Sequence, residues 1–407
     1  MSVRNRLDRL RRQGGAAAPS PLPLAERLAR LGPARRETGV RDSARPGDAE
    51  LAGRCGGECI APGVIRLVET VAPAALHGRL ALSETIRWRP ADEGPAAGYG
   101  GAPLTLVDTE TTGLAGGTGT LVFLLGLLRI EAGTLRLTQL LLTGFHGERA
   151  FVEAAEGELK GTASLVSYNG KAFDIPLLSA RCRLTRRPDP WSGLPHLDLL
   201  HPVRRLFADR WPDCRLATAE RRLLGFERVG DLPGSEAPAA WFDWVRRGDW
   251  RRLPDVARHN RWDLLSLAGL LPVLERAWRA PGEWGGSPLA VARAHLAGGR
   301  ESAALALLGQ ARATLDAEGL LLLARIHRRR GQWREALAIW QPLAEAGHPE
   351  AVERLAKYHE HVARDFTAAL RWTRRLLELQ GGTPEHRRRA ERLCGRLAGA
   401  AATVPVP

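Results

Sequence analysis

Two acids at the end of an apolar run, Asp108 and Glu110, constrain the fold of this chain more than any other feature. The preceding residues 104–107, with the sequence LTLV, predict a buried strand that ends at these acids. A buried carboxylate is costly unless something pairs with it, so two carboxylates facing one spot indicate a bound cation. Thr and Gly residues follow, and they favour a turn after the strand.

The segment that contains these acids alternates between predicted strands and helices. Three successive strands are predicted in residues 104–142, and a short turn at Ala132 and Gly133 joins the last two. The elements predicted after them are a helix, a strand, a helix and a strand, in residues 148–159, 164–169, 174–184 and 196–202, followed by a helix-rich tail that runs to residue 278. This order predicts an α/β fold with a mixed sheet, in which acids at strand ends gather along one edge.

Composition argues against a membrane protein and against a disulfide framework. The chain has 407 residues, of which 44% are hydrophobic, as in globular proteins of two or three domains. Its longest apolar run, residues 121–128, is too short to span a membrane, and the Arg-rich N-terminus lacks the apolar stretch of a secretory signal. Five cysteines are an odd number, and Cys55 and Cys59 lack the further ligands of a zinc site. We therefore expect a cytoplasmic protein with reduced thiols.

Both ends of the chain carry an excess of positive charge. The net charge is +14, with about +5 in residues 1–95 and about +7 in residues 284–407, which indicates an anionic partner such as nucleic acid. Residues 1–55 are rich in Arg, Pro and Ala and are predicted to form a disordered arm. Residues 56–100 are predicted to be a β-rich lead-in with a hairpin and a Gly/Pro-rich hinge.

The last third of the chain repeats with a period of 32 residues. The recurring residues are Ala292, Ala324 and Ala356; His295, His327 and His359; Ala304, Ala336 and Ala368; and Leu308, Trp340 and Trp372. Small residues at fixed positions let paired helices pack closely, so residues 285–395 are predicted to form an all-α repeat domain that resembles tetratricopeptide repeats. Arg293, Arg325 and Lys357 share the period, and two interpretations stay open: a solvated helix face, or a stripe that binds phosphates or a protein partner.

Further acids are available to complete a cation site. Asp174 in YNGKAFDIPLL begins a predicted helix after a strand and a Gly turn, and His259 and Asp263 in HNRWD lie one turn apart on a helix face. Together with Asp108 and Glu110 they give four carboxylates, which can hold two divalent cations, and such oxygen ligands favour Mg²⁺ or Mn²⁺. Two such ions promote phosphodiester hydrolysis, and a neutral histidine can accept the proton of the attacking water.

These motifs resemble those of a known group. DTETTGL, YNGKAFDIPLL and HNRWD, in this order over about residues 100–275, resemble the three motifs of the DEDD 3′-5′ exonucleases within the ribonuclease H-like superfamily. With HLDLLHPVRRLF, GDLPG and the helical tail, the chain is most similar to the bacterial YprB-like branch. The resemblance implies a ribonuclease H-like mixed sheet flanked by helices in residues 101–280. It also implies a hydrolase that shortens single-stranded DNA or RNA from the 3′ end with two metal ions.

The resemblance assigns roles residue by residue. Asp108 would bridge both ions, and Asp174 would serve the second ion. Glu110 and Asp263 would complete the ion that holds the attacking water, and His259 would be the general base. The residues expected to shape the cleft for the terminal nucleotide are Thr111, Thr112, Leu114, Asn169 and Phe173.

Several alternatives stay open at the level of sequence. Three residues separate His259 from Asp263 where the histidine subclass has four, which leaves the direction of the ring open. Asp198 either joins the site or has a structural hydrogen-bonding role. The alternative function is a nucleic-acid-binding scaffold with weak or lost catalysis that recruits partners through its repeats, although the intact acid set argues against it. No motif decides between DNA and RNA, between exo and endo action, or among protein partners, oligomeric states and pathways.

Overall fold

The computed structural model describes residues 45–99, 103–113, 119–381 and 383–402 of the chain. The chain forms two compact units. Of the described residues, the first unit contains those up to Arg89, those of Gly98–His201 and Trp211–Pro272, and the second contains Pro90–Ala97, Pro202–Arg210 and those from Val273 onward.

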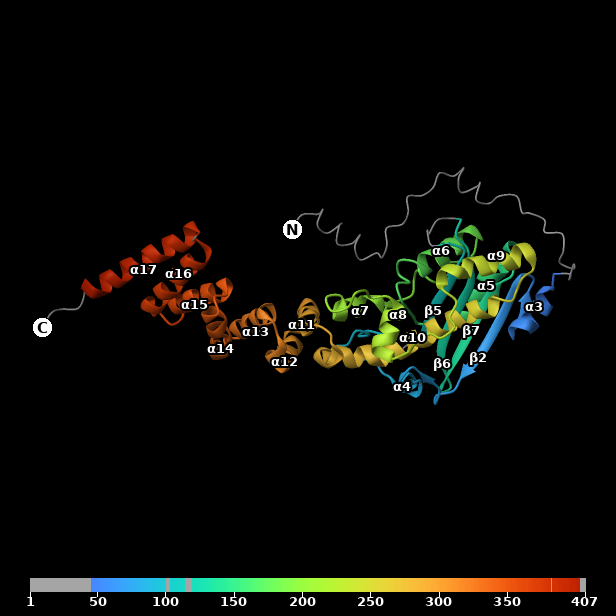
Figure 1. The fold of residues 1–407 in the computed structure, drawn as a ribbon, viewed down its shortest axis with the longest axis horizontal. Helices are drawn as coiled ribbons and strands as arrows, with labels where there is room; N and C mark the ends of the chain where they lie inside the picture. Colours follow the sequence, from blue (N-terminus) through green and yellow to red (C-terminus); the bar gives the residue numbers. More distant parts are fainter. Residues whose placement is uncertain (1–44, 100–102, 114–118, 382, 403–407) are drawn as a thin grey trace. The chain divides into compact units, whose positions relative to one another are not determined.

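A seven-stranded sheet forms the centre of the first unit, with the order β1-β2-β7-β6-β5-β8-β9 (Figure 1). The strands are β1 (Glu58–Ala61), β2 (Val64–Val71), β5 (Leu104–Thr111), β6 (Val122–Glu131), β7 (Thr134–Leu142), β8 (Ser164–Ser167) and β9 (His196–Asp198). Neighbours from β1 to β5 are antiparallel, whereas β5, β8 and β9 are parallel. The predicted α/β class with a mixed sheet is therefore confirmed.

The three predicted strands of residues 104–142 are β5, β6 and β7, and the predicted turn joins the last two. Ala132 and Gly133 have φ angles of +48° and +77°, so both central residues of the turn are left-handed. A two-residue turn of this kind matches the right-handed twist of the strands that it connects. β6 is buried from Val122 to Leu128, as expected for an apolar strand in the middle of a sheet.

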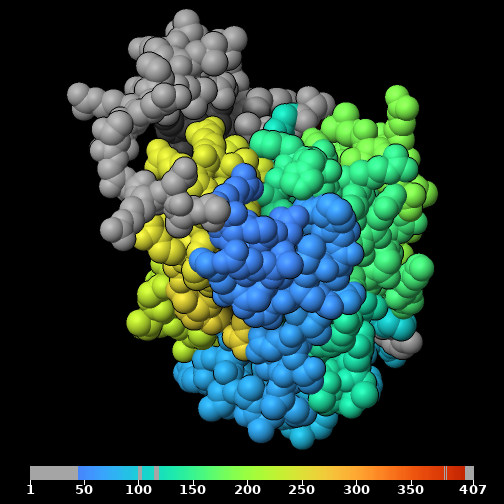
Figure 2. All heavy atoms as spheres, turned by 90° about the vertical axis from the view of Figure 1, so that its right-hand side faces the viewer, coloured from blue at the N-terminus to red at the C-terminus, as the bar shows by residue number. Residues whose placement is uncertain are grey.

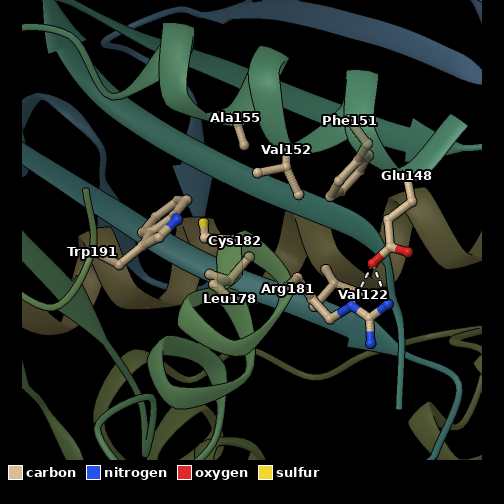
Figure 3. A pocket seen from close by; sticks show the side chains of 9 residues that line it. All are labelled: Val122, Glu148, Phe151, Val152, Ala155, Leu178, Arg181, Cys182 and Trp191. Atoms are coloured by element: carbon tan, nitrogen blue, oxygen red, sulfur yellow. Dashed lines mark hydrogen bonds and ion pairs between the residues drawn. The ribbon is translucent and has the colours of Figure 1, made fainter. Parts of the chain in front are cut away.

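Helices of the first unit flank this sheet and complete its core (Figure 1). The helices and turns of this unit are α3 (Asp48–Cys55), α4 (Ser83–Arg87), η1 (Phe145–Gly147), α5 (Glu148–Glu158), α6 (Asp174–Leu184), α8 (Leu216–Ala219), the π-helical turn η2 (Glu220–Leu224), η3 (Gly234–Glu236), α9 (Ala237–Arg247) and most of α10 (Leu253–Arg279). Most of α7 (Leu200–Phe207) and the end of α10 belong to the second unit. Phe151 of α5 and Leu178 of α6 pack around Val122 of the sheet, and an ion pair between Arg181 and Glu148 lies beside them (Figure 3). These contacts bury the apolar faces of both helices.

The predicted hairpin in the lead-in segment is wrong. The segment expected to form the first strand of this hairpin is β2, which pairs along its whole length with β7 and so belongs to the main sheet. The segment expected to form the second strand contributes only to the two-residue strands β3 (Leu76–His77) and β4 (Leu80–Ala81), which are followed by α4. The hydrogen bonds of β2 are already used by β1 and β7, which leaves no free edge for the second run.

The N-terminal part of the described chain is tied to the sheet through Asp48. Its carboxylate accepts hydrogen bonds from the Gly63 backbone N–H at 2.7 Å and from the Thr143 hydroxyl at 2.7 Å. This explains why the last residues of the predicted disordered arm form α3, while residues 1–44 of that arm lie outside the described residues. Figure 2 shows this N-terminal segment in blue on the surface of the first unit.

The second unit continues as a series of helices after η4 (Pro281–Trp284). These are α11 (Pro288–Ala297), α12 (Glu301–Gln310), α13 (Ala317–Arg329), α14 (Trp333–Glu345), α15 (Pro349–His361), α16 (Phe366–Gln380) and α17 (Pro384–Ala402), with the turn η5 (Arg312–Thr314). Ala292, Ala324 and Ala356 are fully buried, so the 32-residue period does mark close helix packing. The predicted all-α region is confirmed, and its likeness to tetratricopeptide repeats stays a prediction.

Ion pairs partly neutralise the three cations that share the 32-residue period, Arg293, Arg325 and Lys357. Arg293 pairs with Glu318, and Lys357 pairs with Glu353 at 2.5 Å. Arg325 is exposed. Since two of the three cations already have carboxylate partners, a solvated helix face describes this line better than a phosphate-binding stripe.

Candidate metal centre

Asp108 and Glu110 lie two residues apart on β5, so their side chains leave the same face of the strand. Between Glu110 and Thr111 the pairing of β5 with β6 shifts register by one residue. Bulges of this kind are frequent next to active sites because they redirect a side chain at the end of a ladder. Glu110 is 8% exposed and Asp108 is half-buried, so both carboxylates are largely removed from water.

Helix α10 approaches the sheet at Gly126, the residue that pairs with Asp108 on β6. A Cβ at this glycine would lie 2.1 Å from Oδ1 of Asn260, so only glycine leaves room for the helix. Asn260 donates through Nδ2 to the Asp108 carboxylate at 2.7 Å and accepts from Gln139 of β7 at 2.8 Å. A row of paired residues across three strands therefore fixes Asn260, and Asn260 fixes Asp108.

Three of the predicted site residues converge into one group. Glu110, His259 and Asp263 each offer a ligand atom, and these atoms all lie within 4.8 Å of one another. His259 Nε2 is 3.9 Å from Glu110 Oε1 and 3.6 Å from Asp263 Oδ2. The ring nitrogen that faces the acids is therefore Nε2, which answers the question that the motif spacing left open.

Asp231 holds the other ring nitrogen of His259, with 2.8 Å between Nδ1 and Oδ2. A contact this short between a nitrogen and a carboxylate oxygen requires a hydrogen between them, so we place the proton on Nδ1. When the ring is neutral, Nε2 then carries the lone pair, and this nitrogen is the one that faces Glu110 and Asp263. This is the form in which a histidine can accept a proton.

Arg228 connects this histidine to the acids behind it. Its guanidinium donates to Glu220 at 2.6 Å, to Asp231 at 3.1 Å and to Oδ1 of Asp263. Glu220 is buried, so its charge depends on this partner and on the hydroxyl of Ser266. Because Arg228 binds Oδ1 of Asp263, Oδ2 is the oxygen left on the side of His259.

Asp174 is the first residue of α6 and lies near β5. The hydroxyl of Thr109 donates to its Oδ1 at 2.5 Å. The loop before it passes close to the site at Gly170, where a Cβ would meet Ser167 Oγ at 2.3 Å and Asp174 Oδ2 at 3.1 Å. Asp198 accepts hydrogen bonds from the backbone N–H groups of Asn169 and Lys171, at 2.7 Å and 3.1 Å. Asp198 therefore has a structural role: it fixes the loop that leads to Asp174.

The residues predicted to bind the terminal nucleotide differ in their local contacts and in their exposure to solvent. Thr111 donates to the Gly113 carbonyl at 3.0 Å, and the Thr112 hydroxyl accepts from the Leu121 N–H at 3.0 Å. Asn169 has a left-handed φ of +67°, and Phe173, next to Asp174, is 55% exposed. Leu114 lies outside the described residues. The roles of all five in binding a nucleotide stay predictions.

The four acids repel one another. Burial raises the pKa of Asp108 well above its usual value, and the charges of Asp263, Asp174 and Glu110 add to the shift. Burial and the charges of Asp263 and Asp174 also raise the pKa of Glu110 well above its usual value. Burial raises the pKa of Asp174 to about 6, whereas Arg228 and His259 oppose the rise in the pKa of Asp263 that burial causes. An added cation would relieve this repulsion.

The donor set fits a hard divalent cation. All four acids supply carboxylate oxygens, the ligands that Mg²⁺ and Mn²⁺ prefer. Burial and the neighbouring acids raise the pKa values of Asp108 and Glu110, so a bound cation would stabilise their charged forms. The residues present are therefore suited to hold a divalent cation. Among the described residues, the ligand atoms of Glu110, His259 and Asp263 lie close enough together to share one, and Asp108 and Asp174 are not part of this group.

Sequence reasoning missed the residues that hold His259 and the acids in place. Asp231 lies in the GDLPG motif, where an acid beside Pro and Gly is the one signal in the sequence for its position. Arg228 and Glu220 join the site through contacts to Asp263 and Ser266 that are distant in sequence. Asn260 lies next to His259, and only the structure shows that its amide faces the sheet.

Comparison with known proteins gives two sequence matches. A family model described as the RNase_H superfamily matches residues 105–274. The uncharacterized protein YprB of Bacillus subtilis (strain 168) is 34% identical over 290 residues, which cover 68% of this chain and 69% of that protein. The residues matched by the family model include every acid of the candidate metal centre.

Among solved structures, the chain is similar to the family B DNA polymerase of the hyperthermophilic archaeon Pyrobaculum calidifontis. The sequences are 15% identical with a TM-score of 0.34, and the alignment covers 75% of this chain and 38% of the polymerase chain. Similarity at this level carries no argument about function.

Among the described residues, no helix combines the length and the apolar character that crossing a membrane requires.

Proposed function

Since this chain belongs to the YprB-like branch of the RNase H superfamily, we propose that it is a metal-dependent 3′-5′ exonuclease acting on single-stranded DNA or RNA. Membership in the superfamily supports a nuclease-like domain and binding of nucleic acid. The observation that carries the finer proposal is the convergence of Glu110, His259 and Asp263 beside Asp108. A histidine whose free nitrogen faces two carboxylates is suited to take a proton from water held between them.

In this proposal Asp108, Glu110, Asp174 and Asp263 hold two divalent cations. When bound, the cations activate the attacking water and stabilise the charge of the leaving oxygen. His259 accepts the proton of this water at Nε2, and Asp231 accepts the hydrogen bond from Nδ1 as the ring becomes positive. Asn260 keeps Asp108 in place through its amide, and Arg228 keeps Asp263 in place through Oδ1.

We propose that the exposed ring of Phe173 stacks on the terminal base. Its side chain is 55% exposed although it directly precedes Asp174. More than half of this apolar ring is therefore not packed against the protein. Stacking of a base on an aromatic ring contributes about 1–3 kcal/mol and tolerates any base. The Phe173→Ala variant should therefore bind single strands more weakly without losing stability. Its control is Leu184→Ala, an exposed residue at the other end of α6, which should bind them as the natural chain does.

We further propose that residues 101–280 act as the nuclease domain and that the helical repeats in residues 285–395 recruit a protein partner or extend the nucleic-acid path. The positive charge of the chain supplies nonspecific attraction to phosphates. The carboxylate-rich site itself requires bound cations before it can accept a phosphate.

The deciding experiment incubates the purified full chain with single-stranded DNA and RNA oligonucleotides labelled at either end, in Mg²⁺, Mn²⁺ or EDTA. Stepwise shortening from the 3′ end that requires metal and disappears in the Asp108→Ala variant is the expected result. The Asp255→Asn variant changes an acid on the first turn of α10 that pairs with Arg258, and it should retain activity. Binding without cleavage in either metal would instead support the scaffold alternative.

A further inference from the structure

The short strands β3 and β4 pack against η2, the π-helical turn whose first residue is Glu220. The Arg79 N–H, between the two strands, donates to the Leu224 carbonyl at 2.7 Å. A Cβ at Gly78, which has a φ of +62°, would lie 2.2 Å from the same oxygen, so only glycine allows this close approach. The part of the lead-in segment that lies outside the main sheet is therefore held against the turn that carries Glu220.

His77 of β3 reaches helix α10 beside this turn. Its Nε2 lies 2.7 Å from the hydroxyl oxygen of Ser266, and both side chains are buried. Ser266 in turn donates to Oε1 of Glu220. Because a carboxylate can only accept a hydrogen bond, the hydroxyl proton of Ser266 goes to Glu220, and its oxygen accepts from His77. The contact therefore places a proton on Nε2 of His77.

The surroundings of His77 keep its ring uncharged. Burial, together with the charges of Arg228 and Arg261, lowers the pKa of His77 to about 4. The ring also packs on Phe226, which follows η2, with 3.9 Å between the ring centroids and 31° between the planes. At neutral pH, His77 is therefore a neutral donor whose orientation is fixed by packing and by Ser266.

The row of contacts continues from Glu220 to the candidate metal centre. Oε1 of Glu220, the oxygen that Ser266 contacts, also accepts from Nη2 of Arg228 at 2.6 Å, and Oε2 accepts from Nε at 2.9 Å. The same Nη2 donates to Oδ1 of Asp263, and Nη1 donates to Asp231 at 3.1 Å. A guanidinium held through two nitrogens by one carboxylate has a fixed plane. The orientation of Glu220 therefore sets the position of Arg228 and, through it, of Asp263.

We propose that Ser266 and His77 are positioning residues of the candidate metal centre. They fix Glu220, which fixes the guanidinium of Arg228, and Arg228 fixes Asp263. The inference rests on the proposed metal-dependent function and adds to it a contribution from the lead-in strands, which lie outside the three motifs. It also gives the second part of the lead-in segment a role that pairing in the main sheet does not supply.

The test is calorimetric titration of the full chain with Mn²⁺. Ser266→Ala and His77→Phe should each bind Mn²⁺ about tenfold more weakly, as is typical when a partner that supports a metal ligand is removed. His77→Phe keeps an aromatic ring beside Phe226 and removes the donor. His77→Gln, whose side-chain amide can donate to Ser266, should restore most of the affinity.

Thr85→Val is the matched control. Thr85 is buried in α4, and its hydroxyl donates to the Ala268 carbonyl of α10 at 2.8 Å. The variant therefore loses a hydrogen bond between the same lead-in segment and the same helix, on a carbonyl that lies outside the row leading to Arg228. It should bind Mn²⁺ as the natural chain does. A loss equal to that of Ser266→Ala would overturn the inference, because a general loosening of α10 would then explain both.

A second readout uses the metal-free protein and is independent of hydrolysis. The ¹H–¹⁵N signal of the Arg228 Nε–H, identified by its absence in Arg228→Lys, should shift in Ser266→Ala and in His77→Phe and stay unchanged in Thr85→Val. Thermal unfolding establishes that each variant is folded. If Ser266→Ala does not fold, the comparison of His77→Phe with His77→Gln decides.

The outcomes separate this inference from the proposed function. If the natural chain binds Mn²⁺ and the variants bind it equally well, the inference alone is overturned, as it is by an Arg228 signal that does not move. Failure of the natural chain to bind Mn²⁺ would overturn the proposed metal-dependent function and the inference with it. Mn²⁺ binding that weakens as expected, without cleavage of any oligonucleotide, would refute the nuclease proposal and leave the positioning role supported.

Discussion

Asp231 Oδ2 lies 2.8 Å from Nδ1 of His259, and this contact points Nε2 of the ring at Glu110 and Asp263. The orientation of the histidine therefore depends on a loop residue, 28 positions away, rather than on the helix that carries it. Residues that orient a reacting side chain in this way can be tested separately from the metal ligands.

The Asp231→Asn variant should lower the turnover of the proposed nuclease by roughly 10–100-fold, as is typical when a supporting hydrogen bond is changed. An asparagine can present its NH₂ group to Nδ1, which places the lone pair on the wrong ring nitrogen. Steady-state kinetics should show a loss in kcat with little change in KM. ¹⁵N spectra of the histidine rings would report the altered proton position directly, and unchanged spectra with unchanged turnover would refute the role.

Replacing Arg228 by Met should destabilise the protein by roughly 3–5 kcal/mol, because it leaves Glu220 buried without its cation. The free energy of unfolding in urea measures this loss. A double variant, Arg228→Met with Glu220→Gln, should recover part of it, since the uncompensated charge is gone. Arg149→Met removes an exposed partner of Glu153 on α5 and should leave the unfolding curve unchanged. A stable single variant would contradict the importance of this buried pair.

Stability of the metal-free protein should fall as pH rises from about 4 to 6. The folded pKa of Asp174 is about 6, above its ordinary value, so the folded state binds the proton more tightly than the unfolded state does. Below this window the carboxyl is protonated in both states, and above it the buried charge opposes folding. Thermal unfolding of the natural chain and of Asp174→Asn should therefore diverge as pH increases.

Mg²⁺ should reverse this trend by compensating the buried charge. Its effect on the melting temperature should grow as pH rises, because protons compete with the metal for the carboxylates. Melting curves of the natural chain and of Asp174→Asn that run parallel at every pH would contradict the raised pKa.

The Gly126→Ala variant should cost roughly 1–3 kcal/mol of stability, because the added Cβ would lie 2.1 Å from Asn260 Oδ1 and 2.7 Å from Leu264 Cδ1. Helix α10 must move away from the sheet, so Mn²⁺ binding measured by calorimetry should weaken as well. Gly157→Ala is the matched control: it lies within α5 with open space around it and should stabilise the chain by up to about 1 kcal/mol.

Local patterns in the sequence were sufficient for the strands and for the acids at their ends. The apolar run before Asp108 and the turn at Ala132 and Gly133 depend on neighbouring residues, so they could be recognised without a structure. The lead-in hairpin failed because β2 is paired with β7, which lies far along the chain. The direction of the His259 ring depends likewise on a loop contact that helical spacing does not contain.

The site is built from strand and helix ends that are spread over much of the chain. β5, β6 and β7 are consecutive and antiparallel, so they can pair through local turns early in folding. Asp108 and Glu110 can therefore take their places on the sheet before α10 is synthesised. A growing chain on the ribosome that ends before Arg228 holds the carboxylates of Asp108, Glu110 and Asp174 without the arginine and the histidine that complete the set. The finished centre consequently exists only in chains translated through α10.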